Sequence, residues 1–245
     1  MIDSQSYEDL LARIYDEDNP DEPDHDYYRE LADEKSAKNL LDLGCGTGIL
    51  TVTFAQQGRS IVGIDPSESM LNIARERPQE RGIEWRIGTS QNIETDSFDF
   101  AILSGNAVMH ILNQDWNGTL ADIARGLKKG GTLTFETRNP EAKAWESWSH
   151  EKYQRHTSVG LLEETVSVSQ ADQNGVVCLK SENYFVNQNL HFSTALRLQF
   201  RTYEEISSQL EEHGFCINHV YSQWDKTEFV PGTGQPLMIF VCTKH

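Results

Sequence analysis

Three glycines at alternate positions, Gly44, Gly46 and Gly48, follow directly after the apolar run Asn39–Leu43. The run predicts a buried parallel strand. A strand that turns sharply through glycines forms a shelf on which a nucleotide-like ligand can lie against bare backbone. Asp65 ends a second apolar run, twenty-one residues after the first of these glycines. A carboxylate at that spacing can accept hydrogen bonds from both hydroxyls of a ribose, so the pattern predicts a site for an adenosine-like ligand.

The spacing of the glycines separates this loop from two common phosphate-binding loops. The dinucleotide fingerprint G-x-G-x-x-G would need glycine at position 49, where the chain has Ile49. The nucleoside-triphosphate loop would need a Gly-Lys-Ser/Thr ending, and no lysine is present here. The sequence therefore argues against a nicotinamide-dependent oxidoreductase. A helical pattern is expected to start at Thr47.

The pattern Asp-x-Gly-x-Gly-x-Gly, residues 42–48, resembles the first motif of the class I S-adenosylmethionine-dependent methyltransferases. Residues 62–71, Val-Gly-Ile-Asp-Pro-Ser-Glu-Ser-Met-Leu, are similar to the second motif, and residues 97–103 and 127–133 are similar to the segments at strands four and five. The resemblance covers residues 39–138. It implies an α/β fold with a doubly wound, seven-stranded, mostly parallel Rossmann-like sheet and S-adenosyl-L-methionine as cofactor.

The resemblance also implies which residues contact the cofactor. The glycine loop would hold its amino-acid end, the acid after the second strand its ribose, and Met70 its adenine. Thr89 stands where the family commonly has an aspartate for the adenine amino group, so a hydroxyl or the Gln91 amide would take that hydrogen bond. A tyrosine of the N-terminal segment would close over the cofactor, unless these tyrosines only pack in the core. The predicted cofactor-binding residues are Asp42, Gly44, Cys45, Gly46, Gly48, Asp65, Pro66, Met70, Thr89, Ser90, Gln91, Ser104 and Tyr28, with Tyr15 and Tyr27 as alternatives to Tyr28.

Three side chains near the expected ends of the fourth and fifth strands are candidate catalytic residues. Methyl transfer from a sulfonium is an in-line displacement that depends mainly on alignment and exclusion of water. Asn106 stands where the family places a residue near the reactive methyl. His110, with an ordinary pKa of about 6.5, is either a general base for a hydroxyl acceptor or a packing residue. Arg138 either holds an anionic group of the acceptor, or pairs with Glu136 or with an acid of the N-terminal segment.

Composition narrows the choice of partners. The formal net charge is −17, from 38 acidic against 21 basic residues. Such a field repels nucleic acids and anionic membranes, which disfavours nucleic-acid methylation. The four cysteines have no C-x-x-C spacing, and no carboxylates are expected to gather at the pocket, so neither a disulfide framework nor a metal site is predicted. No apolar stretch approaches the roughly 20 residues of a membrane span. We expect a cytoplasmic protein, and the sequence carries no sign of its oligomeric state.

The chain divides into three predicted regions. Residues 1–36 form an acidic helical arm, residues 37–140 together with 202–245 form the cofactor-binding domain, and residues 141–201 form an inserted flap over the substrate. Three β-rich runs at 158–170, 175–187 and 190–201 predict a three-stranded antiparallel flap, with 139–157 as the nearest thing to a linker. Trp145 and Trp148 would either line the acceptor pocket or anchor the flap.

The predicted function is S-adenosylmethionine-dependent methyl transfer to a nitrogen or oxygen nucleophile of a small molecule. Two alternatives remain open at this point. One is a catalytically silent S-adenosylmethionine-binding scaffold or sensor. The other is a protein methyltransferase, because an acidic surface suits a basic partner.

Overall fold

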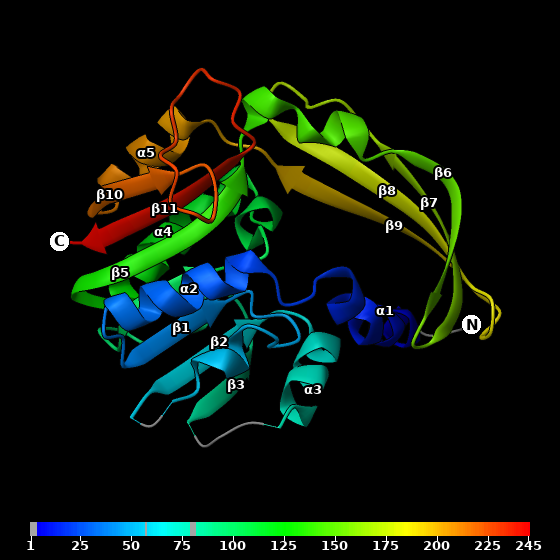
Figure 1. The fold of residues 1–245 in the computed structure, drawn as a ribbon, viewed down its shortest axis with the longest axis horizontal. Coiled ribbons are helices and arrows are strands. Elements are labelled where there is room, and N and C mark those ends of the chain that lie inside the picture. Colours follow the sequence, from blue (N-terminus) through cyan, green and yellow to red (C-terminus); the bar gives the residue numbers. More distant parts are fainter. Residues whose placement is uncertain (1–3, 57, 79–81) are drawn as a thin grey trace.

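A computed structural model describes residues 4–56, 58–78 and 82–245. Seven strands form one sheet in the order β10-β11-β5-β4-β1-β2-β3, at the centre of the larger part of the molecule (Figure 1). Strands β1 to β5 run parallel, and β11 and β10 close the sheet antiparallel. The predicted doubly wound α/β fold is confirmed. The strands are β1 (Asn39–Leu43), β2 (Ser60–Asp65), β3 (Ile83–Ile87), β4 (Phe98–Leu103), β5 (Leu127–Arg138), β10 (Phe215–Tyr221) and β11 (Leu237–Lys244).

Helices cover both faces of this sheet because its central strands are apolar on both sides. Successive side chains of a strand point to opposite faces. Leu40 and Phe100 therefore pack with helix α2 (Pro23–Glu34). On the other face, Leu41 and Leu103 pack in a cluster with residues of α4 (Asn113–Gly126) and α5 (Tyr203–Glu212). Helix α3 (Glu68–Glu76) follows β2 and contacts β3.

Local sequence signals set several helix ends. Ser67 caps α3 by accepting a hydrogen bond from the Met70 amide at 3.4 Å. Thr202 and Glu205, three positions apart, form a capping box at the start of α5. One predicted helix is wrong, however. After Gly48 the chain forms a turn and a short 3₁₀ helix, Thr51–Phe54. Three consecutive β-branched residues, 51–53, disfavour a longer helix here.

The inserted flap is a separate antiparallel sheet of four strands, so the expectation of three is wrong. The unforeseen strand, β6 (His150–Thr157), consists almost entirely of polar residues and is mostly exposed, so it carries no alternating apolar signal. The predicted linker 139–157 contains this strand and two short 3₁₀ turns. The other strands follow the prediction, and they are β7 (Gly160–Val168), β8 (Val176–Phe185) and β9 (Leu190–Gln199).

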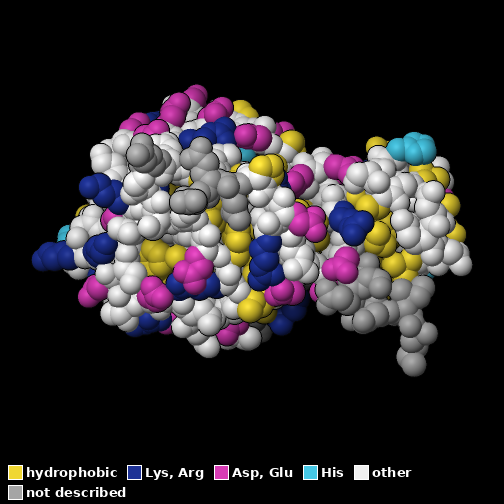
Figure 2. Space-filling view, turned by 90° about the horizontal axis from the view of Figure 1, so that it is seen from below, with side chains coloured by type: hydrophobic (Ala, Val, Ile, Leu, Met, Phe, Trp, Pro, Cys, Tyr) yellow, Lys and Arg dark blue, Asp and Glu magenta, His cyan; other side chains and the backbone are white. Residues whose placement is uncertain are grey.

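The end of the flap at the turn between β8 and β9, which is its far end from the main sheet, packs on helix α1 (Ser4–Asp18) (Figure 1). Tyr7 stacks on Phe192 with ring centroids 3.9 Å apart, and its hydroxyl accepts a hydrogen bond from the Asn183 amide at 2.9 Å. Helix α1 also contacts α3. It therefore joins the flap to the main body, whereas α2 belongs to the core of the main sheet. Figure 2 shows the resulting larger and smaller lobes.

The near end of the flap packs on the segment that follows β4. Trp145 is buried, donates to Gln170 at 3.3 Å, and meets Phe200 edge to face. Trp148 packs against the same phenylalanine. Val177 and Leu198 complete this cluster together with Met109. Of the two interpretations left open for the tryptophans, the structure supports the anchor.

Candidate active site at the carboxyl ends of the strands

The glycine loop needs its glycines for two separate reasons. Gly44, Gly46 and Gly48 all have positive φ, at 81°, 54° and 72°, a region that other residues rarely adopt. In addition, a Cβ at Gly48 would lie 2.5 Å from the ring of Trp85, whose indole fills the space beneath the loop. The sequence motif predicted the glycines but missed Trp85, because the contact joins the loop to a residue on β3.

Asp65 ends β2 directly beside this loop. Its carboxylate accepts hydrogen bonds from the Gly46 amide at 2.9 Å and from the Ser67 amide at 2.8 Å. Burial raises the pKa of Asp65, and these two hydrogen bonds and the nearby His110 oppose the shift. The side chain is nearly buried but keeps some exposure, 8% for the residue. The loop thus holds a carboxylate in a fixed orientation at the place where the sequence predicted a ribose acceptor.

Tyrosine 15 is the N-terminal tyrosine that lies against the loop. Its ring approaches a Cβ position at Gly46 to 3.8 Å, and its hydroxyl approaches one at Gly105 to 3.7 Å. Tyr28, which the sequence analysis chose, is fully buried instead, and its hydroxyl donates to the carboxylate of Glu136. The prediction for Tyr28 does not fit this geometry, since α2 lies in the core and turns the side chain away from solvent. Tyr27 is also buried, in a cluster with Trp224.

Glu136, near the end of β5, was expected at this edge of the sheet, but its partners were not predicted. Besides the Tyr28 hydroxyl, it accepts a hydrogen bond from the backbone amide of Asn106, which has the left-handed φ of 57°. Burial raises the pKa of Glu136 to about 7 against the effect of these hydrogen bonds. Glu136 therefore ties α2 to the start of the segment after β4. No local signal in the sequence announces a contact between residues 108 positions apart.

That segment carries two of the three candidate catalytic residues. Asn106 precedes the 3₁₀ turn Ala107–His110, and Ala107 lies against Gly44, 3.0 Å from its Cβ position. His110 is exposed at the end of the turn, where desolvation lowers its pKa and attraction to Asp65 partly offsets this. The loops after β1, β2 and β4 thus converge, and they bring His110 and Asn106 to the cofactor shelf.

Arg138, the third candidate, is half-buried at the end of β5. The alternative that it pairs with Glu136 does not fit, because no ion pair joins these two side chains in the described part of the chain, and the Glu136 oxygens accept from Tyr28 and Asn106. Within the part of the chain that the structure describes, no acidic side chain lies within ion-pair distance of Arg138. The guanidinium is available to an anionic group.

The remaining predicted contacts lie around the same shelf but differ in availability. Ser90 is buried and donates its hydroxyl to Asp122 of α4 at 2.8 Å, so its side chain is engaged elsewhere. Thr89 caps the short turn 90–92 together with Asn92. Gln91 and Pro66 are exposed, while Met70, Cys45 and Ser104 are half-buried.

The acids around the loop make the site suited to a cation. Asp42 is buried under the loop, and one of its oxygens accepts from the Thr51 hydroxyl at 2.6 Å. Its other oxygen, and the side-chain oxygen of Asn106, have no hydrogen-bond partner among the described residues. Burial raises the pKa of Asp42 to about 7. Burial also raises the pKa of Tyr15, and the charges of Asp65, Asp16, Glu136 and Asp42 raise it further. A positively charged sulfonium or ammonium group would be stabilised here, because acidic side chains surround the loop and two oxygens lack a hydrogen-bond donor.

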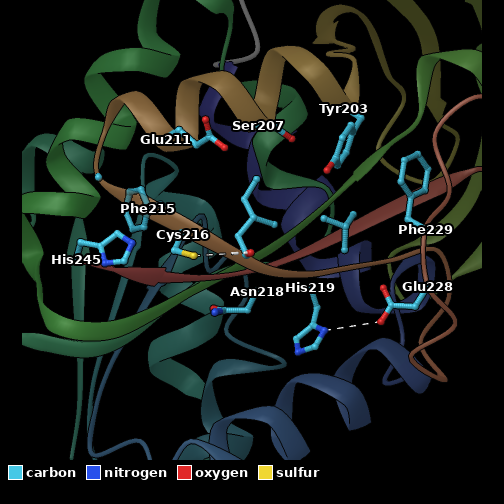
Figure 3. A pocket seen from close by; sticks show the side chains of 13 residues that line it. Tyr203, Ser207, Glu211, Phe215, Cys216, Asn218, His219, Glu228, Phe229 and His245 are labelled. Carbon is cyan, nitrogen blue, oxygen red and sulfur yellow. Dashed lines mark hydrogen bonds and ion pairs between the residues drawn. The ribbon is translucent and has the colours of Figure 1, made fainter.

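A second recess lies away from these residues. A groove of about 650 Å³ runs between α5 and β10, and Figure 3 shows its side chains, among them Tyr203, Asn218 and His219. None of the predicted site residues lines it. It adjoins an antiparallel edge strand, whereas ligands of open α/β sheets bind beyond the carboxyl ends of the parallel strands. The candidate active site is therefore the shelf at Gly44–Gly48.

Comparison with known proteins shows similarity to methyltransferases. Residues 40–131 match the family described as methyltransferase domain. A ubiquinone biosynthesis O-methyltransferase of Hahella chejuensis is 33% identical over 155 residues, which span 58% of this chain and 64% of that protein. The match thus covers less than two thirds of this curated relative. In sequence the chain is thus similar to methyltransferases over residues 40–131 and to S-adenosylmethionine-dependent methyltransferases in fold.

Two solved structures show the same fold over nearly the whole chain. An S-adenosylmethionine-dependent methyltransferase from Clostridium acetobutylicum superposes with a TM-score of 0.77 at 16% identity, over 96% of this chain and 98% of that one. CalS10, an amino pentose methyltransferase from Micromonospora echinaspora solved with bound S-adenosylmethionine, gives 0.65 at 22% identity, over 93% of each chain. At such identities the likeness extends to the fold, flap included, and says nothing about the acceptor.

Proposed function

We propose that this chain transfers a methyl group from S-adenosylmethionine to a nitrogen or oxygen nucleophile of a small molecule. The observation that carries the proposal is the Asp65 carboxylate, held against the glycine loop by the Gly46 amide with Tyr15 beside it. When bound, the cofactor supplies a methyl group activated on a sulfonium. The chain's part is to bind, orient and exclude water.

The cofactor half of the site is assigned to the first two loops. Asp65 accepts from the ribose hydroxyls, and the turns of the glycine loop allow close approach to the amino-acid end. Met70 lies in the first turn of α3, from which it can contact the adenine. Tyr15 replaces Tyr28 as the tyrosine that covers the cofactor. The acids around it favour a positively charged ligand.

The acceptor half is assigned to the segment after β4 and to the flap. Because its pKa is lowered, His110 is mainly neutral at pH 7 and can accept a proton from a hydroxyl or an ammonium acceptor. Asn106 orients the acceptor through its unpartnered side-chain oxygen. Arg138 holds an anionic substituent, if the acceptor has one. Residues 141–201 act as the substrate cap. Of the predicted arm 1–36, helix α1 covers the cofactor, whereas α2 belongs with the remainder to the cofactor-binding domain.

The inner face of the flap offers the acceptor an apolar surface. Register places Leu179 opposite Leu196 and Ser181 opposite Thr194 on the face that meets α1 at one end and Met109 at the other. Between these two packed ends, Leu196 remains 45% exposed. A small molecule with an apolar portion would cover it.

Two features support a small, non-polymeric acceptor. The relatives named above methylate in ubiquinone biosynthesis or act on an amino pentose. Figure 2 shows lysine and arginine side chains scattered among acidic ones on the visible face, which offers no track for a nucleic acid.

No described helix combines the length and apolar character needed to cross a membrane. All four cysteines are free, which supports the cytoplasm as the proposed location.

Calorimetric titration with S-adenosylmethionine and S-adenosylhomocysteine tests the cofactor site. Asp65→Ala should weaken binding by at least about 10- to 100-fold, the loss expected for one hydrogen bond to a charged group at about 1.5–3 kcal/mol. Asp115→Ala, which removes an exposed acid of α4, is the control and should bind like the wild type. A wild type that binds neither ligand contradicts the proposal.

Turnover separates an enzyme from a silent scaffold or sensor. With a panel of small amines, phenols and hydroxy compounds, the wild type should release S-adenosylhomocysteine. His110→Ala should slow this release while leaving cofactor affinity unchanged. If the wild type binds the cofactor but releases S-adenosylhomocysteine with none of these acceptors and with no basic protein substrate, the chain is the silent scaffold or sensor.

A further inference from the structure

Arg201 is one of the largest fully buried side chains in the described structure, with only 1% of the residue exposed. It stands between the last strand of the flap, β9, and helix α5. Its guanidinium donates to the Ile111 carbonyl at 2.5 Å, to the Val108 carbonyl at 3.3 Å and to the Asn113 side-chain oxygen at 2.9 Å. Two of these acceptors, Val108 and Ile111, lie on either side of His110, and the third, Asn113, is the first residue of α4.

The charge of Arg201 has no acidic counterpart nearby. Among the described residues no carboxylate lies within 4 Å, and the guanidinium stands over the ring of Trp116 at 4.8 Å. Burial lowers its pKa to about 10, and the more distant Glu205 opposes the shift, so the group stays charged at neutral pH. A buried cation with neutral acceptors is costly, and an apolar side chain of similar volume would serve packing better. Packing alone therefore does not explain an arginine here.

The acceptors of Arg201 flank the candidate base. Val108 and Ile111 stand on either side of Met109 and His110, in a turn of only four residues. Within this turn, the Ile111 amide bonds to the Val108 carbonyl at 3.2 Å. The Arg201 guanidinium donates to both carbonyls and so holds the end of the turn. Glu136 holds the start of the turn by accepting from the Asn106 amide.

The same junction holds the flap. Phe200 and Leu198, next to Arg201 in sequence, pack with Met109. The side-chain oxygen of Gln199 accepts from the Asn113 amide at 3.4 Å. Consecutive residues 198–201 thus attach the flap to the turn 107–110. A displacement of the flap must displace His110 too, or break these contacts.

We propose that Arg201 is a positioning residue, which fixes the imidazole of His110 relative to the flap and so to the methyl acceptor. This inference rests on the proposed function in so far as His110 acts on the acceptor. Its structural part, that Arg201 holds the turn under His110, can be tested without any acceptor.

The test compares Arg201→Met, Arg201→Lys and the matched control Arg197→Met. Arg197 lies on the same strand but is exposed, on the outer face of the flap. The first readout is the titration of the His110 imidazole by NMR in the enzyme without acceptor. In Arg201→Met a loosened turn should let more water reach the imidazole, so the pKa of His110 should rise, because desolvation is what lowers it. Asp65 is the charged group that acts on His110, and it is unchanged in all three variants.

The second readout is kinetic. Arg201→Met should lower kcat about 10- to 100-fold, the effect expected of a misplacement of about 1 Å, with S-adenosylmethionine affinity within about twofold of the wild type. Arg201→Lys keeps the charge but cannot reach all three acceptors at once, so it should show the same changes to a smaller degree. Arg197→Met should show neither change.

The proposal is overturned if Arg201→Met has the same His110 pKa and the same kcat as the wild type, after correction of kcat for the folded fraction. If Arg201→Met does not fold, Arg201→Lys decides in the same way. An equal loss of cofactor affinity in both Arg201 variants would also overturn it, because the glycine loop would then depend on Arg201 too. Should the wild type bind cofactor but methylate nothing, the proposed function fails, while the His110 titration still decides whether Arg201 holds the turn.

Discussion

The two sheets bury their apolar side chains in different ways. The seven-stranded sheet is covered on both faces along its central strands, and its loops converge on a shelf held largely by backbone contacts, as between Asp65 and the Gly46 amide. Among the described residues, the four-stranded flap is covered at its two ends, by α1 and by the cluster around Met109. The covered sheet suits a constant ligand, and the partly open one suits a ligand that differs between relatives.

The largest effect is expected where backbone and packing constraints coincide. Gly48→Ala combines a positive φ with an overlap with Trp85, so the free energy of unfolding should fall by about 2–5 kcal/mol and cofactor binding should be lost. Urea unfolding and calorimetry measure both. Gly130→Ala is the control, since its φ is 80° but nothing lies within 4 Å of the added Cβ. If the two variants are equally stable, Trp85 does not constrain the loop.

A smaller effect should appear in the pH dependence of stability. The pKa of Glu136 is raised to about 7 in the folded state, so between about pH 4.5 and 7 the unfolded chain holds fewer protons there than the folded one. Stability should therefore fall as pH rises through this window and level off above it. In Glu136→Gln the fall should be shallower by about 2–3 kcal/mol, measured by urea unfolding at pH 5 and pH 8.

The exposed Glu76→Gln is the control for this measurement and should keep the wild-type slope. Asp42, whose pKa is also raised to about 7, should leave a residual fall in Glu136→Gln. A slope in Glu136→Gln identical to that of the wild type would contradict the raised pKa.

The smallest effect on stability is expected in the open part of the flap. Leu196→Ala should change the free energy of unfolding by no more than about 0.5 kcal/mol, because the side chain is 45% exposed. It should still raise KM for the acceptor and leave cofactor affinity unchanged. Leu198→Ala, two residues along on the same face but 8% exposed, should cost about 2–5 kcal/mol. An unchanged KM in Leu196→Ala would place the acceptor elsewhere.

What could be predicted from the sequence follows the same division. Contacts between near neighbours leave local signals in the sequence. The glycine loop was predicted from such a signal, and the Ser67 cap and the Thr202 capping box follow equally local patterns. Contacts across the chain leave none. Tyr28 and Glu136 are 108 positions apart, and Arg201 reaches Ile111 across 90 positions. Strand β6 was missed because its polar side chains lack alternation, and Tyr28 was chosen over Tyr15 because burial cannot be read from residue type alone.

Helix α1 has a mechanical consequence. Its Asp16 accepts from the Thr47 hydroxyl at 2.5 Å and pairs with Arg77 on the main body, while Asp18 pairs with Arg155 of the flap at 2.7 Å. Because the other end of the flap packs on Met109, both ends of the flap are attached, and it cannot swing as a unit about one end. A ligand that enters from the side must therefore fit the span between the two ends, and a larger one could enter after the ionic contacts of α1 break.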